Sequence, residues 1–189
     1  MKNKAAHLFT VLGHPLILGT VYVFFMAAAN LPSRQAFLLS VLVVGFIALP
    51  ITWHNLRKLK KGQYSNFDVS DQNQRKGFYP FALGLFLILF LSFYFLEFPP
   101  AVLYNSGNFT IMLACLALVN LKIKASLHAA TAFYAGISVF SISMTGGIII
   151  MGLAMATTWS RWELKRHSPL ELLIGAMVGM FFGMISLNL

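Results

Sequence analysis

Acidic residues, cysteine and charge in general are scarce in this sequence. Five Asp and Glu residues stand against fourteen Lys and Arg residues, and Cys115 is the single cysteine among 189 residues. A lone thiol cannot close an internal disulfide. Charged residues make up 10% of the chain and apolar residues 58%. Because so little polar surface is left to cover a core, the composition excludes a water-soluble globular protein and indicates an integral membrane protein.

Long apolar runs take up most of the chain. About 20 apolar residues cross a hydrocarbon core of about 30 Å, and seven runs approach this length. They cover residues 8–29, 36–53, 78–98, 101–121, 125–143, 146–160 and 169–187. YNSGN interrupts the fourth, the sixth is short, and MTGG (144–147) is typical of a tight turn between the fifth and sixth. The sequence predicts one all-α domain over residues 1–189, a polytopic transmembrane helix bundle with six to seven spans.

Basic residues gather on one side of this expected bundle. With seven spans, the N-terminus, the loop 54–77, the link 122–124 and the segment 160–171 share a side, and they hold every Lys and Arg except Arg34. Because basic loops stay in the cytoplasm, we expect this side to face the cytoplasm at the cell (inner) membrane. The net charge of +9 then faces anionic headgroups or an anionic substrate, and no nucleic-acid partner is expected.

Two polar clusters lie at span ends on this same side. Lys124, Ser126 and His128 form the first, in KASLH, and Arg161, His167 and Glu171 form the second, in SRWELKRHSPLE. Polar groups at membrane depth or at a span mouth are costly to place there, so they are candidates for function.

The histidines and the glutamate fit phosphoryl transfer. A carboxylate one helical turn away can hold one ring N–H, so Glu171 can orient His167 with its other nitrogen directed at phosphorus. His128 can protonate the departing alkoxide. We therefore expect these three residues to carry the chemistry.

Basic and hydroxyl side chains fit the phosphate group. Arg161 offers a forked, permanently charged donor set for the non-bridging oxygens. Lys124 and Arg75 are further cations near the same span ends, and the Ser126 hydroxyl can donate a hydrogen bond. We expect these four residues to bind the substrate phosphate.

The same stretches resemble two signatures of the type 2 phosphatidic acid phosphatase superfamily. SRWELKRHSPLE is similar to its third signature, S-R-x5-H-x3-D, with glutamate for aspartate, and ASLH is similar to its second, P-S-G-H. The resemblance implies a membrane lipid phosphatase that hydrolyses a lipid phosphomonoester or diphosphate without a metal or cofactor. It implies that His167 forms a phosphohistidine, Glu171 orients it and His128 is the general acid.

The first signature, K-x6-R-P, is not matched. The corresponding segment reads DVSDQNQRKGFYPF, with Arg75 and Pro80 but no Arg-Pro pair. We expect Arg75 and Lys124 to fill two basic positions of the site. The resemblance also implies a site facing the exterior, whereas the loop charges predict the cytoplasmic side, and we follow the charges.

Other interpretations fit parts of the pattern. Ser168, Pro169 and Glu171 have the spacing of a helix capping box, and one carboxylate can serve both roles. His14 before Pro15 favours a proline kink with a satisfied histidine. A non-catalytic anionic-lipid-binding or transport-related protein of the same fold is the main functional alternative. A lipid phosphotransferase is another alternative. An intramembrane prenyltransferase would bind Mg²⁺ through two acidic motifs; NFDVSD (66–71) could be one of them, but this sequence has no second one.

Overall fold

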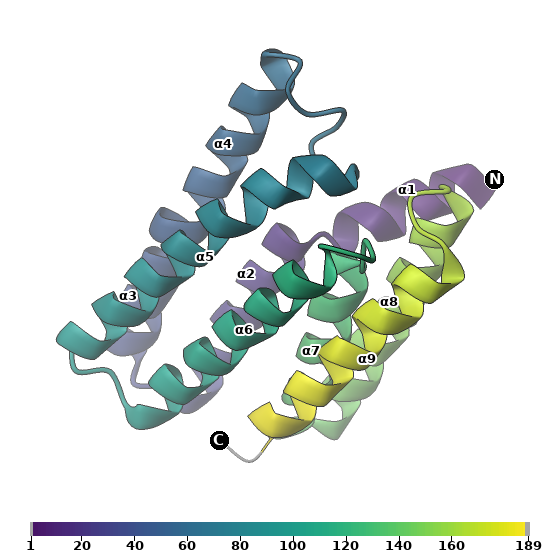
Figure 1. Ribbon diagram of the computed structural model, residues 1–189. Helices are drawn as coiled ribbons and strands as arrows, with labels where there is room; N and C mark the ends of the chain where they lie inside the picture. Colours follow the sequence, from purple (N-terminus) through teal and green to yellow (C-terminus); the bar gives the residue numbers. More distant parts are fainter. Residues whose placement is uncertain (1, 188–189) are drawn as a thin grey trace.

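Helices account for all regular structure in the part of the chain that is described. The computed structural model describes residues 2–187, which contain no β-strand (Figure 1). The elements are α1 (Lys2–Leu12), α2 (Pro15–Asn30), α3 (Ser33–Val43), the π-helical segment η1 (Val44–Ala48), α4 (Leu49–Lys60), α5 (Gln72–Phe95), α6 (Pro100–Val119), α7 (Leu127–Val139), α8 (Met144–Glu163) and α9 (Pro169–Ser186). The predicted all-α class is confirmed.

Local sequence sets where the functional helices begin. Proline lies in the first turn of α2, α6 and α9, where its missing N–H costs no hydrogen bond. The side chains of Ser126 and Ser168 accept backbone N–H groups at the starts of α7 and α9. These two caps fix the backbone next to His128 and His167.

Several helices are long and apolar enough to cross a membrane. Among the described residues they are four: Ser33–Lys60, which runs through α3, η1 and α4, and the helices α5, α6 and α9. The helices α1 and α2 meet at a 50° bend and make a fifth span if the bent pair is counted as one. The helix α7 has 13 residues, fewer than the about 20 that a span needs. The helices are consistent with a multi-pass membrane protein of four to five clear spans.

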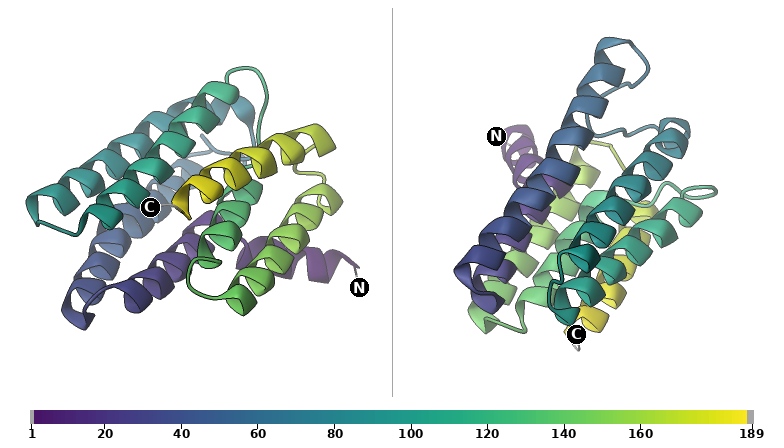
Figure 2. Two further views of the ribbon diagram at one scale, coloured as in Figure 1. Left: turned by 90° about the horizontal axis from the view of Figure 1, so that it is seen from below. Right: turned by 90° about the vertical axis from the view of Figure 1, so that its left-hand side faces the viewer.

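The short helix α7 is enclosed by its neighbours. It packs against α8, α9 and α2, and most of its residues are buried (Figures 1 and 2). Glycines let α9 approach closely, because a Cβ on Gly175 would overlap the Ser126 carbonyl oxygen and a Cβ on Gly179 that of Ala130. The Ser126 backbone N–H also donates to the Glu171 carbonyl oxygen at 3.0 Å. The starts of α7 and α9 are thereby held side by side.

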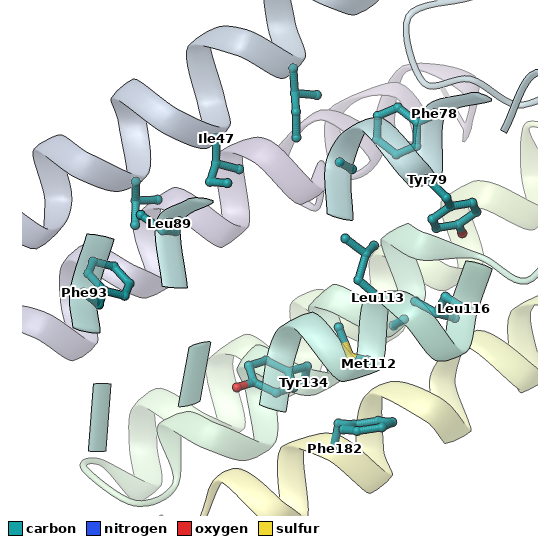
Figure 3. Close-up of a cluster of buried hydrophobic side chains, with 14 of the residues drawn as sticks. Ile47, Phe78, Tyr79, Leu89, Phe93, Met112, Leu113, Leu116, Tyr134 and Phe182 are labelled. Atoms are coloured by element: carbon teal, nitrogen blue, oxygen red, sulfur yellow. The ribbon is translucent and has the colours of Figure 1, made fainter. Parts of the chain in front are cut away.

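An apolar core joins the remaining helices. Figure 3 shows Leu89 and Phe93 of α5, Leu113 of α6 and Tyr134 of α7 among its side chains. Other large apolar side chains point outward, and Phe95 is 75% exposed. An outward apolar surface of this kind is suited to contact with lipid.

Two connections and one interruption differ from the sequence-based expectation. The expected loop 54–77 shortens to residues 61–71, because α4 continues to Lys60 and Asp71 caps α5. MTGG is not a turn but the first turn of α8, with Ser143 as its cap. YNSGN does not break α6, since the Asn105 side chain donates to a carbonyl of the preceding turn and that of Asn108 to the Phe182 carbonyl.

Candidate functional site

The residues predicted to form the site lie at one end of the bundle, where four connections meet. His167 contacts the carbonyl of Lys124, Arg75 donates to the carbonyl of Ala125, and Arg161 pairs with Asp68 of the α4–α5 loop. The structure thus brings together the whole predicted set, which is His128, His167, Glu171, Arg161, Ser126, Lys124 and Arg75.

His167 follows α8 and is held in one orientation. Its Nδ1 lies 3.1 Å from Oε2 of Glu171 and 3.2 Å from the carbonyl oxygen of Lys124. Both partners are acceptors, so Nδ1 carries the proton and Nε2 has the lone pair. Nε2 lies 3.5 Å from Nη2 of Arg75. This is the tautomer that an attacking histidine needs.

Burial and nearby positive charge keep His167 neutral. Its residue surface is 5% exposed. Burial first, and then the charges of Arg75, Arg161 and Lys124, lower the pKa of His167 to about 2. The contact with Glu171 is therefore a hydrogen bond from a neutral ring rather than an ion pair, and the nucleophilic form prevails at neutral pH.

Glu171 completes a capping box and orients His167 at the same time. Its Oε2 accepts the Ser168 backbone N–H at 3.0 Å, and its own N–H donates to the Ser168 hydroxyl at 3.3 Å. Lys124 reaches the same carboxylate, with Nζ 3.8 Å from Oε2, and donates to the Arg166 carbonyl at 3.1 Å. Both roles of Glu171 in the sequence analysis are thus compatible, while the Lys124 ammonium already has acceptors.

Arg75, at the start of α5, is buried and joins two connections through hydrogen bonds. Its Nε donates to the Val69 carbonyl at 2.8 Å and its Nη1 to the Ala125 carbonyl at 2.7 Å. The remaining nitrogen, Nη2, faces Nε2 of His167. Two connections therefore fix the guanidinium, and its positive charge lies beside Nε2 of His167.

Arg161 is fully buried in α8 and has a partner that the sequence analysis did not assign. Its Nη1 lies 2.6 Å from Oδ2 of Asp68 and 2.9 Å from Oγ1 of Thr10. Its Nε and Nη2, on a separate edge of the guanidinium, have no hydrogen-bond partner among residues 2–187. Unpaired buried donors are costly, and a forked pair matches two oxygens of a phosphate group.

Asp68 is an ionised carboxylate in the α4–α5 loop. Burial raises its pKa, but the hydrogen bond from His14 and the interactions with His128 and Arg161 outweigh burial and hold the pKa well below its usual range. The negative charge of Asp68 is therefore in direct contact with Arg161, the arginine that was expected to bind phosphate.

His128 and Ser126 lie at the start of α7. His128 is 3% exposed, and its Nε2 has no hydrogen-bond partner within the described part of the chain. The closest approach to a carboxylate is 3.9 Å, between Nε2 and Oδ2 of Asp68. The Ser126 Oγ accepts the Ala129 backbone N–H at 3.3 Å as the cap of α7. The cap uses the hydroxyl of Ser126 only as an acceptor.

His14, Asp68 and His128 bring three possible metal ligands within 4.8 Å of one another. However, Nδ1 of His14 accepts the Leu16 backbone N–H at 3.2 Å, so Nε2 carries the proton in the neutral ring and faces Oδ1 of Asp68 at 3.4 Å. A protonated nitrogen offers no lone pair to a metal, and Arg161 already neutralises Asp68. The cluster fits a hydrogen-bond network better than a metal centre. The expected satisfied histidine at the α1–α2 bend is confirmed.

A cavity of about 520 Å³ extends from this cluster along the helices. His14, Asp68, Arg75 and His128 line its polar end, and mostly apolar side chains of α2, α3, α5, α6 and α7 line most of the rest. Its wall continues as far as Leu31, just after α2. His167 and Arg161 are not part of the wall but contact residues that are, namely Arg75 and Asp68.

Comparisons with known proteins assign no family. The chain matches no protein-family model, no curated protein and no solved structure. The geometry of the site is therefore the basis for proposing a function.

Three residues of the cluster lie outside the predicted set: Thr10, His14 and Asp68. A signal for Asp68 is present in the sequence, because it precedes Arg75 by seven positions. This is the spacing of the first signature, K-x6-R, with a carboxylate in place of the lysine. Thr10 has no comparable signal, since its contact with Arg161 spans 151 residues.

Proposed function

We propose that this protein is an integral membrane lipid phosphate phosphatase that works through a phosphohistidine on His167. The environment of His167 carries the proposal. The ring is buried and neutral, Glu171 and Lys124 hold its Nδ1, and its Nε2 is directed at a buried arginine. A carboxylate, an imidazole and a cation in this order form the arrangement of an activated nucleophile beside an anion-binding group.

The reaction proceeds in two displacements. Nε2 of His167 attacks phosphorus in line, so an N–P bond forms as the ester P–O bond breaks. Glu171 stabilises the positive charge that develops on the ring through Nδ1–H. His128 gives its proton to the departing lipid oxygen, which leaves as an alcohol. Water then attacks the phosphohistidine, its proton returns to His128, and inorganic phosphate departs.

Arginines supply the charge stabilisation that dominates phosphoryl transfer. Arg75 lies beside the attacking nitrogen, and Arg161 has an unpaired Nε and Nη2 edge. Since the helices leave both guanidiniums little freedom, the charges are preorganised for the transferring group. No metal ion is needed in this scheme.

A bilayer lipid fits the remaining features. Its apolar tail would occupy the cavity, and its phosphate would lie at the polar end beside Arg75 and His128. Six spans would require the bent pair α1–α2 and the short helix α7 to lie within the membrane, and seven would require α8 as well. Loop charges would place the site on the cytoplasmic side of the cell (inner) membrane, opposite to the side that the signature resemblance implies. A reporter fused to the C-terminus tests this orientation.

Phosphate release tests the proposal. Purified protein in lipid nanodiscs is given phosphatidate, phosphatidylglycerophosphate or polyprenyl phosphate. We expect His167→Ala to abolish release, while His7→Ala, at an exposed position of α1, leaves it unchanged. EDTA should have no effect. Release that persists in His167→Ala excludes this nucleophile.

The ion pair between Asp68 and Arg161 favours a second candidate, an anionic-lipid-binding protein without catalysis. A carboxylate at this arginine opposes a phosphate dianion by like-charge repulsion. This candidate predicts equal binding of phosphatidate by the original protein and by His167→Ala, with no release from either. Binding measured beside release separates the two functions.

A further inference from the structure

Asp68 has no role in the two displacements described above, yet it is the carboxylate nearest to the general acid. We propose that Asp68 is a positioning residue that stabilises the protonated form of His128, so that His128 can protonate the departing lipid oxygen. The inference rests on the proposed phosphatase function.

The surroundings of His128 explain why it needs a carboxylate. Four titratable or charged groups act on its ring: His14 from the α1–α2 bend, Asp68 from the α4–α5 loop, Arg75 from α5 and Arg161 from α8. Asp68 is the negative one among them. Burial and two guanidiniums all oppose a positive charge on the ring, so an imidazolium requires a compensating anion at short range.

Asp68 is fixed at the distance that this role demands. His14 faces its Oδ1 at 3.4 Å, and Arg161 binds its Oδ2 at 2.6 Å, so neither oxygen can turn away. Oδ2 lies 3.9 Å from Nε2 of His128, and the His14 ring packs against the His128 ring at 5.1 Å in an edge-on contact. At 3.9 Å the carboxylate acts through space and leaves the Nε2 proton for another acceptor.

With Asp68 in this role, each proton transfer in the two steps has a donor and an acceptor. As the P–O bond breaks, the electron pair stays on the lipid oxygen, and the Nε2 proton of His128 moves to it. His128 becomes neutral while Asp68 stays ionised and forms no bond to substrate. When water attacks the phosphohistidine, His128 accepts its proton, and Asp68 again stabilises the resulting imidazolium.

The dependence on the leaving group distinguishes this role from a structural one. An alkoxide leaves only with protonation, whereas a nitrophenolate leaves without it. Asp68→Asn keeps the shape of the side chain and one oxygen for Arg161 but removes the charge. We expect it to slow first-turnover release of the alcohol from a lipid alkyl phosphate by about 10²- to 10⁴-fold. First-turnover release of nitrophenolate, which precedes hydrolysis of the phosphohistidine, should fall by less than about 10-fold, and His128→Ala should show the same pattern.

The experiment measures both first-turnover rates, release of the lipid alcohol and release of nitrophenolate, on each protein sample in nanodiscs. Because the ratio of the two rates does not depend on the folded fraction, partial unfolding of Asp68→Asn cannot imitate the effect. Glu163→Gln, a neutralised acid that makes no contact with this cluster, is the control and should keep the original ratio. The double variant Asp68→Asn with His128→Ala should be no slower than His128→Ala alone, since residues that act as a unit are not additive.

Two results would overturn the inference. Equal slowing of both esters by Asp68→Asn would reduce Asp68 to a structural role while leaving the phosphatase intact. A rise in alkyl phosphate hydrolysis with Asp68→Lys would show that the position needs a cation. Absence of any His167-dependent hydrolysis of nitrophenyl phosphate overturns the phosphatase proposal itself, and with it the role of Asp68.

Discussion

Oε2 of Glu171 lies 3.1 Å from Nδ1 of His167 and 3.0 Å from the backbone nitrogen of Ser168. One oxygen therefore orients an imidazole and completes the N-terminal cap of α9. Because α9 packs closely on α7, this cap also determines where His167 lies relative to His128. In the proposed mechanism this carboxylate serves both folding and chemistry, and single substitutions can separate the two contributions.

Glu171→Gln tests the orienting role. Glutamine keeps the capping box, because it also serves at that position, but its side chain no longer stabilises a charged ring. We expect turnover to fall by roughly 10²- to 10⁴-fold, as when the acid behind a catalytic histidine is made an amide. Thermal stability should hardly change.

Ser168→Ala is the matched variant for the cap. It removes the hydroxyl that accepts the Glu171 N–H and should cost about 1 kcal/mol of stability, while activity stays within a few-fold. Loss of activity in Ser168→Ala with full activity in Glu171→Gln would reverse the assignment of the two roles.

Arg161→Lys tests the unpaired guanidinium edge. Lysine keeps the positive charge next to Asp68 but lacks the forked Nε and Nη2 donors. We expect kcat/KM for lipid phosphates to fall by about 10²- to 10³-fold. Arg166→Lys, at an exposed position in the next loop, should have no effect. Undiminished activity of Arg161→Lys would show that the fork does not hold the phosphate.

Acid should not protonate His167. Its pKa of about 2 in the folded protein lies far below the ordinary value of 6.5. Between these values an unfolded chain takes up a proton that the folded chain does not, so stability falls as the pH drops below about 6.5. The proposed nucleophile stays neutral, and single-turnover phosphorylation by nitrophenyl phosphate should be nearly constant from about pH 8 to about pH 5.

Arg75→Gln should change that profile. Removing this neighbouring charge raises the pKa of His167 toward its ordinary value. The loss of phosphorylation rate at acidic pH should therefore begin at a higher pH than in the original protein. The shapes of the two profiles are compared, since Arg75→Gln also slows the reaction. A decline centred near the ordinary histidine pKa in the original protein would contradict the neutral, shielded nucleophile.

Gly179→Ala tests the packing that brings the two halves of the site together. Its Cβ would overlap the Ala130 carbonyl, so α7 and α9 must separate, at a cost of about 1–3 kcal/mol. Activity should fall as well, because His128 and His167 move apart. A Cβ added at Gly152 in α8 has no neighbouring atom within 4 Å, so Gly152→Ala should be tolerated. Equal behaviour of the two variants would show that the close contact is dispensable.

The membrane class could be predicted from the sequence, but the number of spans could not. Long apolar runs identify helices that need an apolar surrounding. They do not show whether that surrounding is lipid or protein. The helix α7 is apolar because α8, α9 and α2 enclose it, and its 13 residues are too few to span. Hydropathy alone counts such a buried helix as a span.

Contacts between residues close in sequence could be predicted at the site, whereas contacts between distant residues could not. His167 and Glu171 are four residues apart at a helix start, so their contact follows from helical geometry. Asp68 and Arg161 are 93 residues apart and meet only because the loop 61–71 folds over the end of α8. No periodicity encodes such a contact, which depends on the complete tertiary structure.

Detection of the covalent intermediate tests the central claim most directly. His128→Ala protein in nanodiscs is mixed with nitrophenyl phosphate, quenched in base, digested and analysed by mass spectrometry. Because this variant lacks the group that accepts the proton from water, we expect a base-stable, acid-labile phosphoryl adduct to accumulate on His167. Phosphate release by the original protein without an adduct on His167, or with the adduct on another residue, would contradict the account.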